Sequence, residues 1–250
     1  MIANAKPSFN VVWLPWILAA FLLGGMVVWI SVMGYDGLYG QDAYAHLNYA
    51  IDIQQFWQSG EPLGTYQWPR LYAFLGAIWP FGDPRSWMQF LAMAGAALSF
   101  VMTAKILQRL IRTSDWLPFL TLAFVGFSPL LMRNSLSIMA DAPAVGLMLT
   151  AVWLGLRFEE SGKMVHFLAA AFFAGFAVML RYPVALAVFY PMLYWIWIAI
   201  RRKFWWGLLF FLPCFAIAAL PQLLLPKTVG EGLTQPFQHQ HFLQWSFQNF

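Results

Sequence analysis

Asp42 and His46, in the segment GQDAYAHLNYA, are two residues whose types and spacing suit catalysis or metal binding. They are four positions apart, so on a helix they share one face. A carboxylate and an imidazole placed in this way could hold a metal ion or pass a proton. The structural alternative is that Asp42 caps the helix while His46 reaches a polar–apolar interface. The nearby Asp36, beside a glycine, is typical of a turn.

Two further segments carry side chains suited to binding an anion. SPLLMRNSLSIMADAP holds Arg133 and Asp141, and RYP begins with Arg181. A guanidinium recognises phosphate well, and a neighbouring carboxylate could orient it or bind a metal. The structural alternatives are an ion pair between Arg133 and Asp141, and an interfacial anchor at Arg181.

Several classes of enzyme have no motif in this sequence. It contains no phosphate-cradling glycine loop, no nucleophile elbow and no CxxC pair, and Cys214 is its one cysteine. His239 and His241 would share a face in an extended segment, although a solvated loop is the favoured interpretation. The net charge of +4 does not indicate nucleic acid, because the basic residues stand at the ends of apolar runs.

The elements that must position these residues are membrane spans. Apolar residues make up 61% of the chain, and long apolar runs recur along it. We therefore predict an all-α, polytopic transmembrane bundle of about seven spans. The predicted spans are Val11–Met33, Ser86–Ala104, Trp116–Met132, Ala142–Leu156, Val165–Leu180, Val184–Ile200 and Phe204–Leu225.

The distribution of charge orients the predicted bundle. With the N-terminus inside, 9 of the 14 basic residues fall on the inner side, whereas 7 of the 10 acidic residues fall outside. This agrees with the tendency of Lys and Arg to remain on the cytoplasmic side. A site built from pairable charges is therefore expected at the outer face.

The first outer loop, residues 34–85, holds Asp42 and His46. Within it, Asp42–Ser59 has a helical apolar stripe that includes Ala43, Leu47 and Ala50, which predicts an amphipathic helix lying on the outer membrane surface. Leu71–Phe81 is too short to span and predicts a half-helix or a surface segment. The second outer region is the C-terminal tail, 226–250.

Taken in order, these segments resemble the GT-C superfamily of membrane glycosyltransferases. The resemblance is to the dolichyl-phosphate-mannose–protein mannosyltransferases and the lipid A aminoarabinose transferases. It is carried by the acidic loop motif GQDAYAHLNYA, the stretch WPRLYAFLGAIWPFGDP, a span that ends in basic residues, the segment SPLLMRNSLSIMADAP and the junction RYP. It covers nearly all of 1–250, which is read as a single GT-C-like module.

The resemblance implies an inverting transferase that moves a sugar from a polyprenyl-phosphate donor at the periplasmic or lumenal face. Asp42 would be the catalytic base or a metal-linked group, with His46 as a second candidate metal ligand and substrate contact. Arg133 and Arg181 would bind the lipid phosphate, and Asp141 would organise the site. No cofactor is firmly implied; a divalent metal is an open alternative. The implied partners are the lipid donor, membrane lipids and a membrane protein complex, with no nucleic acid.

Two departures from the family pattern support a different interpretation. Many relatives have two adjacent acids in the first loop, whereas Gln41 precedes Asp42 here, and relatives usually continue with further spans. The alternative is a short, non-catalytic GT-C-like subunit that binds a partner complex or lipid. A transporter is less favoured, because the charges lie at one face and no repeat is evident. The expected location is the bacterial inner membrane, with a cytoplasmic N-terminus.

Overall fold

The computed structural model describes residues 9–64, 66–81, 83–111, 116–126 and 128–226, and every regular element within these ranges is helical. The prediction of an all-α fold is confirmed for this part of the chain. The tail beyond Pro226, with His239 and His241, lies outside the described residues. The elements are α1 (Phe9–Met33), α2 (Gly40–Ser59), α3 (Leu71–Ala77), α4 (Pro84–Ile111), α5 (Leu117–Gly126), α6 (Pro129–Leu136), α7 (Asp141–Ser161), α8 (Met164–Leu180), α9 (Val184–Arg201), α10 (Trp205–Ala216), η1 (Ile217–Ala219) and α11 (Leu220–Leu224).

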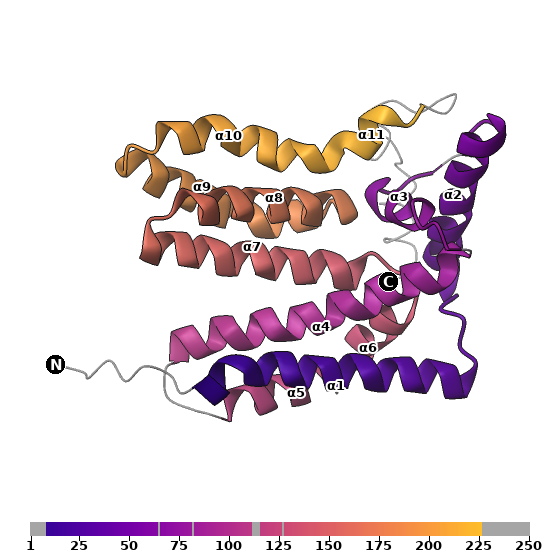
Figure 1. Ribbon diagram of the computed structural model, residues 1–250, viewed down its shortest axis with the longest axis horizontal. Coiled ribbons are helices and arrows are strands. Elements are labelled where there is room, and N and C mark those ends of the chain that lie inside the picture. The colour runs from indigo at the N-terminus through magenta and orange to yellow at the C-terminus, as the bar shows by residue number, and fades with distance from the viewer. Residues whose placement is uncertain (1–8, 65, 82, 112–115, 127, 227–250) are drawn as a thin grey trace, which may run out of the picture.

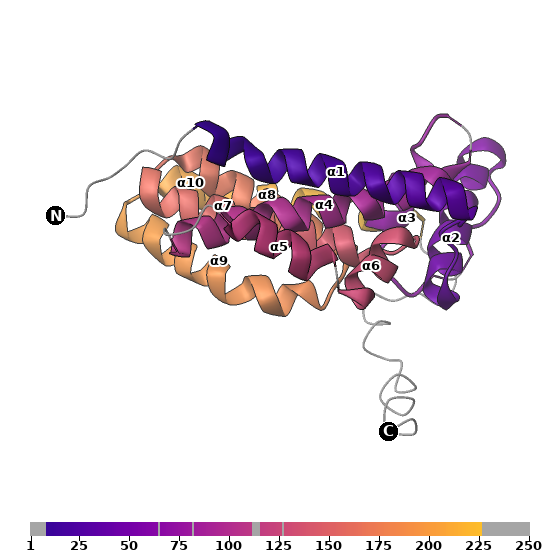
Figure 2. The ribbon, with the colours of Figure 1, turned by 90° about the horizontal axis from the view of Figure 1, so that it is seen from below.

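The long helices run side by side along the long axis of the molecule (Figure 1). α4 packs between α1 and α7, and α8 packs between α7 and α10. α9 contacts α7, α8 and α10, and α1 runs along the edge of the row (Figure 2). The result is a bundle whose two ends are formed by helix termini and the loops between them.

Small residues bring these helices close together. A Cβ added at Gly175 of α8 would collide with the backbone of Phe215 in α10, and one at Gly155 of α7 would collide with the Trp195 ring of α9. Helices in lipid gain little from hydrophobic burial against one another, so close packing of small residues is a main source of their association. The glycines therefore fix where α8 and α9 lie relative to their neighbours.

Five helical segments are long and apolar enough to cross a membrane: α1, α4, α7, α9 and the run Trp205–Leu224, which joins α10, η1 and α11. This is the architecture of a multi-pass membrane protein. The apolar α8 has 17 residues and spans about 26 Å at ~1.5 Å per residue, slightly less than a hydrocarbon core of ~30 Å. A count of seven spans remains a prediction.

The predicted third span, Trp116–Met132, is wrong as one continuous helix. The chain forms two helices there, α5 and α6, whose axes differ by 80°. The backbone of the second helix restarts at Ser128 and Pro129, where the Ser128 hydroxyl accepts a hydrogen bond from Leu131 N at 3.4 Å. A proline in the first turn of a helix and a serine cap are ordinary signals of a helix start, and here they begin α6 as a separate helix.

The helices α2 and α3 lie across one end of the bundle, called here the α2 end (Figure 1). The helical prediction for Asp42–Ser59 is confirmed, and Ala43, Leu47 and Ala50 of its apolar stripe are buried. The stripe packs on α3 and α4 within the protein. The placement of α2 on the outer membrane surface stays a prediction.

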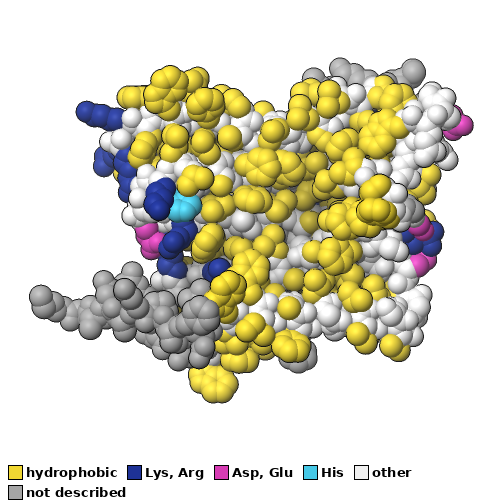
Figure 3. Space-filling model, in the orientation of Figure 1, with side chains coloured by type: hydrophobic (Ala, Val, Ile, Leu, Met, Phe, Trp, Pro, Cys, Tyr) yellow, Lys and Arg dark blue, Asp and Glu magenta, His cyan; other side chains and the backbone are white. Residues whose placement is uncertain are grey.

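Charged side chains gather at the two ends, with a broad apolar zone between them (Figure 3). The opposite end, called here the basic end, carries most of the Lys and Arg side chains visible in that view. This distribution suits a protein whose middle faces hydrocarbon and whose ends face water.

Candidate functional site

Three of the predicted site residues meet at the α2 end. Arg181 Nε donates to Asp141 Oδ1 at 2.9 Å, and Arg181 Nη2 donates to Asp141 Oδ2 at 3.2 Å. The same Nη2 lies 3.7 Å from Asp42 Oδ2. The three side chains, called here the carboxylate–arginine cluster, are 20–30% exposed, so solvent or a ligand can reach them. One guanidinium thus faces two carboxylates.

Each member of the cluster stands at a helix terminus. Asp42 lies in the first turn of α2, Asp141 is the first residue of α7, and Arg181 directly follows α8. The positive end of a helix dipole favours a carboxylate in the first turn, which suits both aspartates. The capping alternative is not what the structure shows, because the N-cap of α2 is Tyr39 and makes no side-chain cap.

Hydrogen bonds between the loops that precede α2 and α7 bring the two aspartates together. Ile138 N donates to Gly37 O at 2.9 Å, and the hydroxyls of Tyr35 and Ser137 are 2.8 Å apart. Gly37 has a φ of 79°, and a Cβ there would press on Ile138. Only glycine adopts this conformation without strain while allowing so close an approach.

The buried Gln89 of α4 hydrogen-bonds the loop before α2 and the last residue of α6. Its Nε2 donates to Leu136 O at 2.8 Å and to Tyr35 O at 3.4 Å. A polar side chain at this depth needs such partners, because an unsatisfied amide is expensive to bury. Gln89 therefore couples the packing of α4 to the separation of Asp42 and Asp141.

Trp68 covers one face of the arginine. The Arg181 Cζ lies 4.9 Å from the centroid of the Trp68 ring, within the range of a cation–π interaction. The tilted ring also contacts His46, at 6.4 Å between centroids. Trp68 thus links the arginine of the cluster to the interior of the first loop.

Burial, which is the larger effect, raises the pKa of Asp42 above its ordinary value of 3.8, and the charge of Asp141 adds to the rise. The Arg181 guanidinium opposes the shift. A carboxylate whose pKa is raised in this way is a better proton acceptor than one in water, provided that it remains ionised at the working pH.

His46 is almost completely buried and is directed into an aromatic pocket. Its Nδ1 hydrogen-bonds the hydroxyl of Tyr66, and its ring meets Tyr72 edge-on at 5.1 Å between centroids. Burial, with a smaller effect of Arg181, lowers the pKa of His46 to about 3, so the ring is neutral at physiological pH. His46 Nε2 has no hydrogen-bond partner within the described ranges.

No group of three or more His, Cys, Asp or Glu side chains that could hold a metal ion occurs among the residues that the structure describes. Asp42 and His46 share α2 as predicted, but the Nδ1 of His46 faces Tyr66 and the carboxylate of Asp42 faces Arg181. Their assignment as metal ligands stays a prediction.

Arg133 lies apart from the cluster's ion pairs. It is exposed on α6, and its Cζ stands 5.2 Å from the ring centroid of Tyr39, the residue before α2. The alternative of an Arg133–Asp141 ion pair is not realised, since Asp141 pairs with Arg181. Arg133 is placed beside the start of the helix that carries Asp42, where its role as a phosphate contact remains a prediction.

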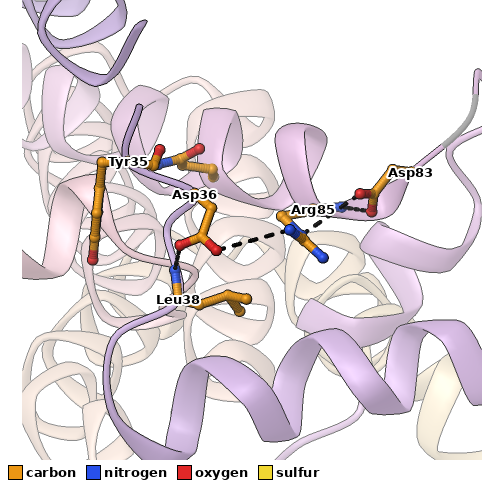
Figure 4. Close-up of polar contacts among 6 residues, drawn as sticks. Tyr35, Asp36, Leu38, Asp83 and Arg85 are labelled. Atoms are coloured by element: carbon orange, nitrogen blue, oxygen red, sulfur yellow. Dashed lines mark hydrogen bonds and ion pairs between the residues drawn. The ribbon is translucent and has the colours of Figure 1, made fainter. Parts of the chain in front are cut away.

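A second group of charged side chains at the α2 end, Asp36, Asp83 and Arg85, can be compared with the carboxylate–arginine cluster (Figure 4). Asp36 Oδ1 accepts from Leu38 N at 3.0 Å, which confirms the predicted turn, and Asp36 Oδ2 lies 3.8 Å from Arg85 Nη1. Arg85 also faces Asp83 at 3.6 Å. These side chains are 40–56% exposed, so their ion pairs contribute little to stability.

Arg70 is a residue of the site region that the sequence did not single out. It is 2% exposed, and its Nη1 donates to the carbonyls of Leu225 and Pro226, both at 3.1 Å. Its backbone N donates to Gln222 at 3.3 Å. Arg70 thereby ties the first loop to the end of α11. Its signal in the sequence was a charge inside the aromatic stretch YQWPR.

Tyr66, Trp68 and Tyr72 are further residues of the site region that the sequence did not single out. The structure buries Tyr66 and Tyr72 around His46 and lays Trp68 on Arg181. Aromatic residues at a membrane boundary and aromatic residues lining a polar site have the same composition, so only contacts distinguish them.

In the comparisons with known proteins, no family model, no curated protein and no solved structure matched this chain.

Proposed function

We propose that this protein is a glycosyltransferase that moves a sugar from a polyprenyl-phosphate donor to an acceptor hydroxyl at the α2 end, with inversion. The observation that carries the proposal is the convergence of Asp42, Asp141 and Arg181 at partly exposed helix termini. The proposal draws further support from the order of motifs that resembles the GT-C superfamily. The α2 end would face the periplasm of a bacterial inner membrane, and the N-terminus the cytoplasm, with about seven spans between.

The proposed reaction uses each member of the cluster differently. The acceptor oxygen forms a bond to the anomeric carbon as its proton passes to the Asp42 carboxylate. The bond between that carbon and the phosphate oxygen breaks, and its electron pair leaves with the lipid phosphate. Arg181 stabilises the charge that develops there, and Asp141 holds the guanidinium in place through two hydrogen bonds.

The rate of transfer should fall as the pH is lowered through the pKa of Asp42. A general base must be ionised, and burial with Asp141 raises this pKa above 3.8 against the opposing charge of Arg181. The acidic limb of kcat/KM should therefore lie above pH 3.8. His46, with a pKa of about 3, contributes no limb in this range. A profile that is flat down to pH 4 would contradict the role of Asp42.

The function is tested by measuring sugar transfer by the purified chain in liposomes that contain a polyprenyl-phosphate-sugar donor. The measured product is the polyprenyl phosphate that is released. Asp42→Asn should lower the rate at least a hundredfold, because the amide cannot accept the proton. The matched control is Asp36→Asn. It makes the same chemical change in the same loop, on an exposed turn that pairs with Arg85, and should leave the rate within about twofold.

Two outcomes would contradict the proposal. If the wild-type chain consumes no donor while its helical spectrum and thermal transition are intact, the alternative of a non-catalytic subunit that binds a complex or lipid is favoured. If Asp42→Asn and Asp36→Asn behave alike in an active protein, the catalytic base lies elsewhere.

A further inference from the structure

The basic end of the bundle holds a charge arrangement that the proposed function does not use. The described basic residues at these helix ends are Lys105, Arg109, Arg157, Lys163, Arg201, Arg202 and Lys203, against Glu159 and Glu160. Some of these cations serve the helices themselves. Arg202, for example, donates to the carbonyls of Phe158 and Glu159 at 3.0 and 2.6 Å and so closes the end of α7.

Lys105 is different, because it is enclosed by aromatic rings from two other helices. Its Nζ lies 5.0 Å from the ring centroid of Trp16 on α1 and 5.1 Å from that of Trp153 on α7. No carboxylate lies within ion-pair distance of it in the described part of the chain. The rings attract the ammonium but do not neutralise it, so among the described residues its charge is uncompensated.

The described charged side chains beside Lys105 are mostly donors. Arg157 lies against the same Trp153 ring, at 5.7 Å, and Glu160 is shared between Arg109 at 3.2 Å and Arg157 at 3.6 Å. One carboxylate therefore serves two guanidinium groups, and the group as a whole keeps an excess of positive charge.

Two buried donors on α4 also lack an acceptor. Gln108 and Arg109 follow Lys105 by three and four positions, so all three share a helix face. Gln108 Nε2 and Arg109 Nη1 are buried without a hydrogen-bond partner among the described residues. A buried N–H group without an acceptor is unfavourable, and a ligand rich in acceptor oxygens would satisfy several at once.

We infer that Lys105, Arg109 and Arg157, with the rings of Trp16 and Trp153, bind the phosphate of an anionic phospholipid at the basic end. A phosphate supplies both the charge and the acceptor oxygens that these donors lack. The lipid source is favoured because Trp16 is 40% exposed on α1, whose apolar surface is open along its length, so acyl chains can lie beside the site. The inference is independent of the proposed transferase activity.

The experiment is native mass spectrometry of the full chain in detergent, with phosphatidylglycerol, phosphatidylcholine or sodium phosphate added separately. Phosphatidylglycerol should be retained in preference to phosphatidylcholine, and Lys105→Gln should weaken its retention about fivefold. Lys105→Arg, which keeps the charge, should retain phosphatidylglycerol as the wild type does. The matched control is Lys163→Gln, which removes the same charge from an exposed position at the same end and should change retention less than twofold.

Three results would overturn the inference: equal retention of the two lipids, equal effects of Lys105→Gln and Lys163→Gln, or displacement of phosphatidylglycerol by millimolar sodium phosphate. The last would assign the site to free phosphate. If Lys105→Gln does not fold, as judged by its helical spectrum, Arg157→Gln gives the same test, because Arg157 is about half exposed and lies on the same ring.

Discussion

Replacing Arg181 by alanine is expected to lower sugar transfer about a thousandfold. The change removes the group proposed to stabilise the departing phosphate, a loss of 10²–10³ where a single such donor is removed from an enzyme. It also leaves Asp42 and Asp141 without the cation that holds both, which lies 3.7 Å from Asp42 and 2.9 Å from Asp141 in the wild type. Without Arg181 the pKa of Asp42 loses the one effect that lowers it, so less of the base is ionised.

Arg85→Ala is the matched control for this prediction. Arg85 also faces two aspartates at the α2 end, but it is more exposed than Arg181, at 40% against 20%, and its partners lie outside the cluster. Both variants are measured in the liposome assay over a range of pH. Arg181→Ala should move the acidic limb to higher pH, whereas a purely structural role would lower the rate without moving it. Activity of Arg181→Ala within tenfold of the wild type would exclude the proposed phosphate contact.

Replacing Gly95 by alanine is expected to be among the most damaging single-methyl changes in the bundle. A Cβ at Gly95 of α4 would collide with the backbone N and Cα of Pro143 in α7, and backbone atoms cannot turn aside as a side chain can. The two helices must separate, which we expect to destabilise the fold by about 1–3 kcal/mol, the usual range for overpacking. Asp141 lies two residues before Pro143, so the cluster should be displaced as well.

The control for Gly95→Ala is Gly24→Ala in α1. Both glycines are inside helices, but nothing lies within 4 Å of a Cβ added at Gly24. Alanine is the better helix former by about 1 kcal/mol, so Gly24→Ala should be neutral or stabilising. Thermal unfolding in detergent measures both. A transition temperature for Gly95→Ala equal to that of Gly24→Ala would show that α4 and α7 are less closely packed at this point.

Most helices were predictable because their signals are local. An apolar run such as Val184–Ile200 specifies a helix wherever it is placed, and the observed α9 differs from it by a single residue at one end. The break between α5 and α6 was missed because continuous hydrophobicity outweighed the local signal of Ser128 and Pro129. Among the candidate site residues, Asp42, Asp141 and Arg181 were found by type and position, since a charged group beside an apolar run is conspicuous in so apolar a chain.

The sequence by itself determined that this is a helical membrane protein with most of its acids at one end and most of its bases at the other. Only the tertiary structure decided which charges meet. Arg181 pairs with Asp141 across 40 positions, while Arg133, nearer in sequence to Asp141, turns to Tyr39. That choice depends on contacts such as Ile138 N to Gly37 O and on the hydrogen bonds of Gln89 to Leu136 and Tyr35, which form only when distant segments pack. Hydrophobic patterning is read along one helix, whereas the pairing of helix ends depends on how whole helices pack.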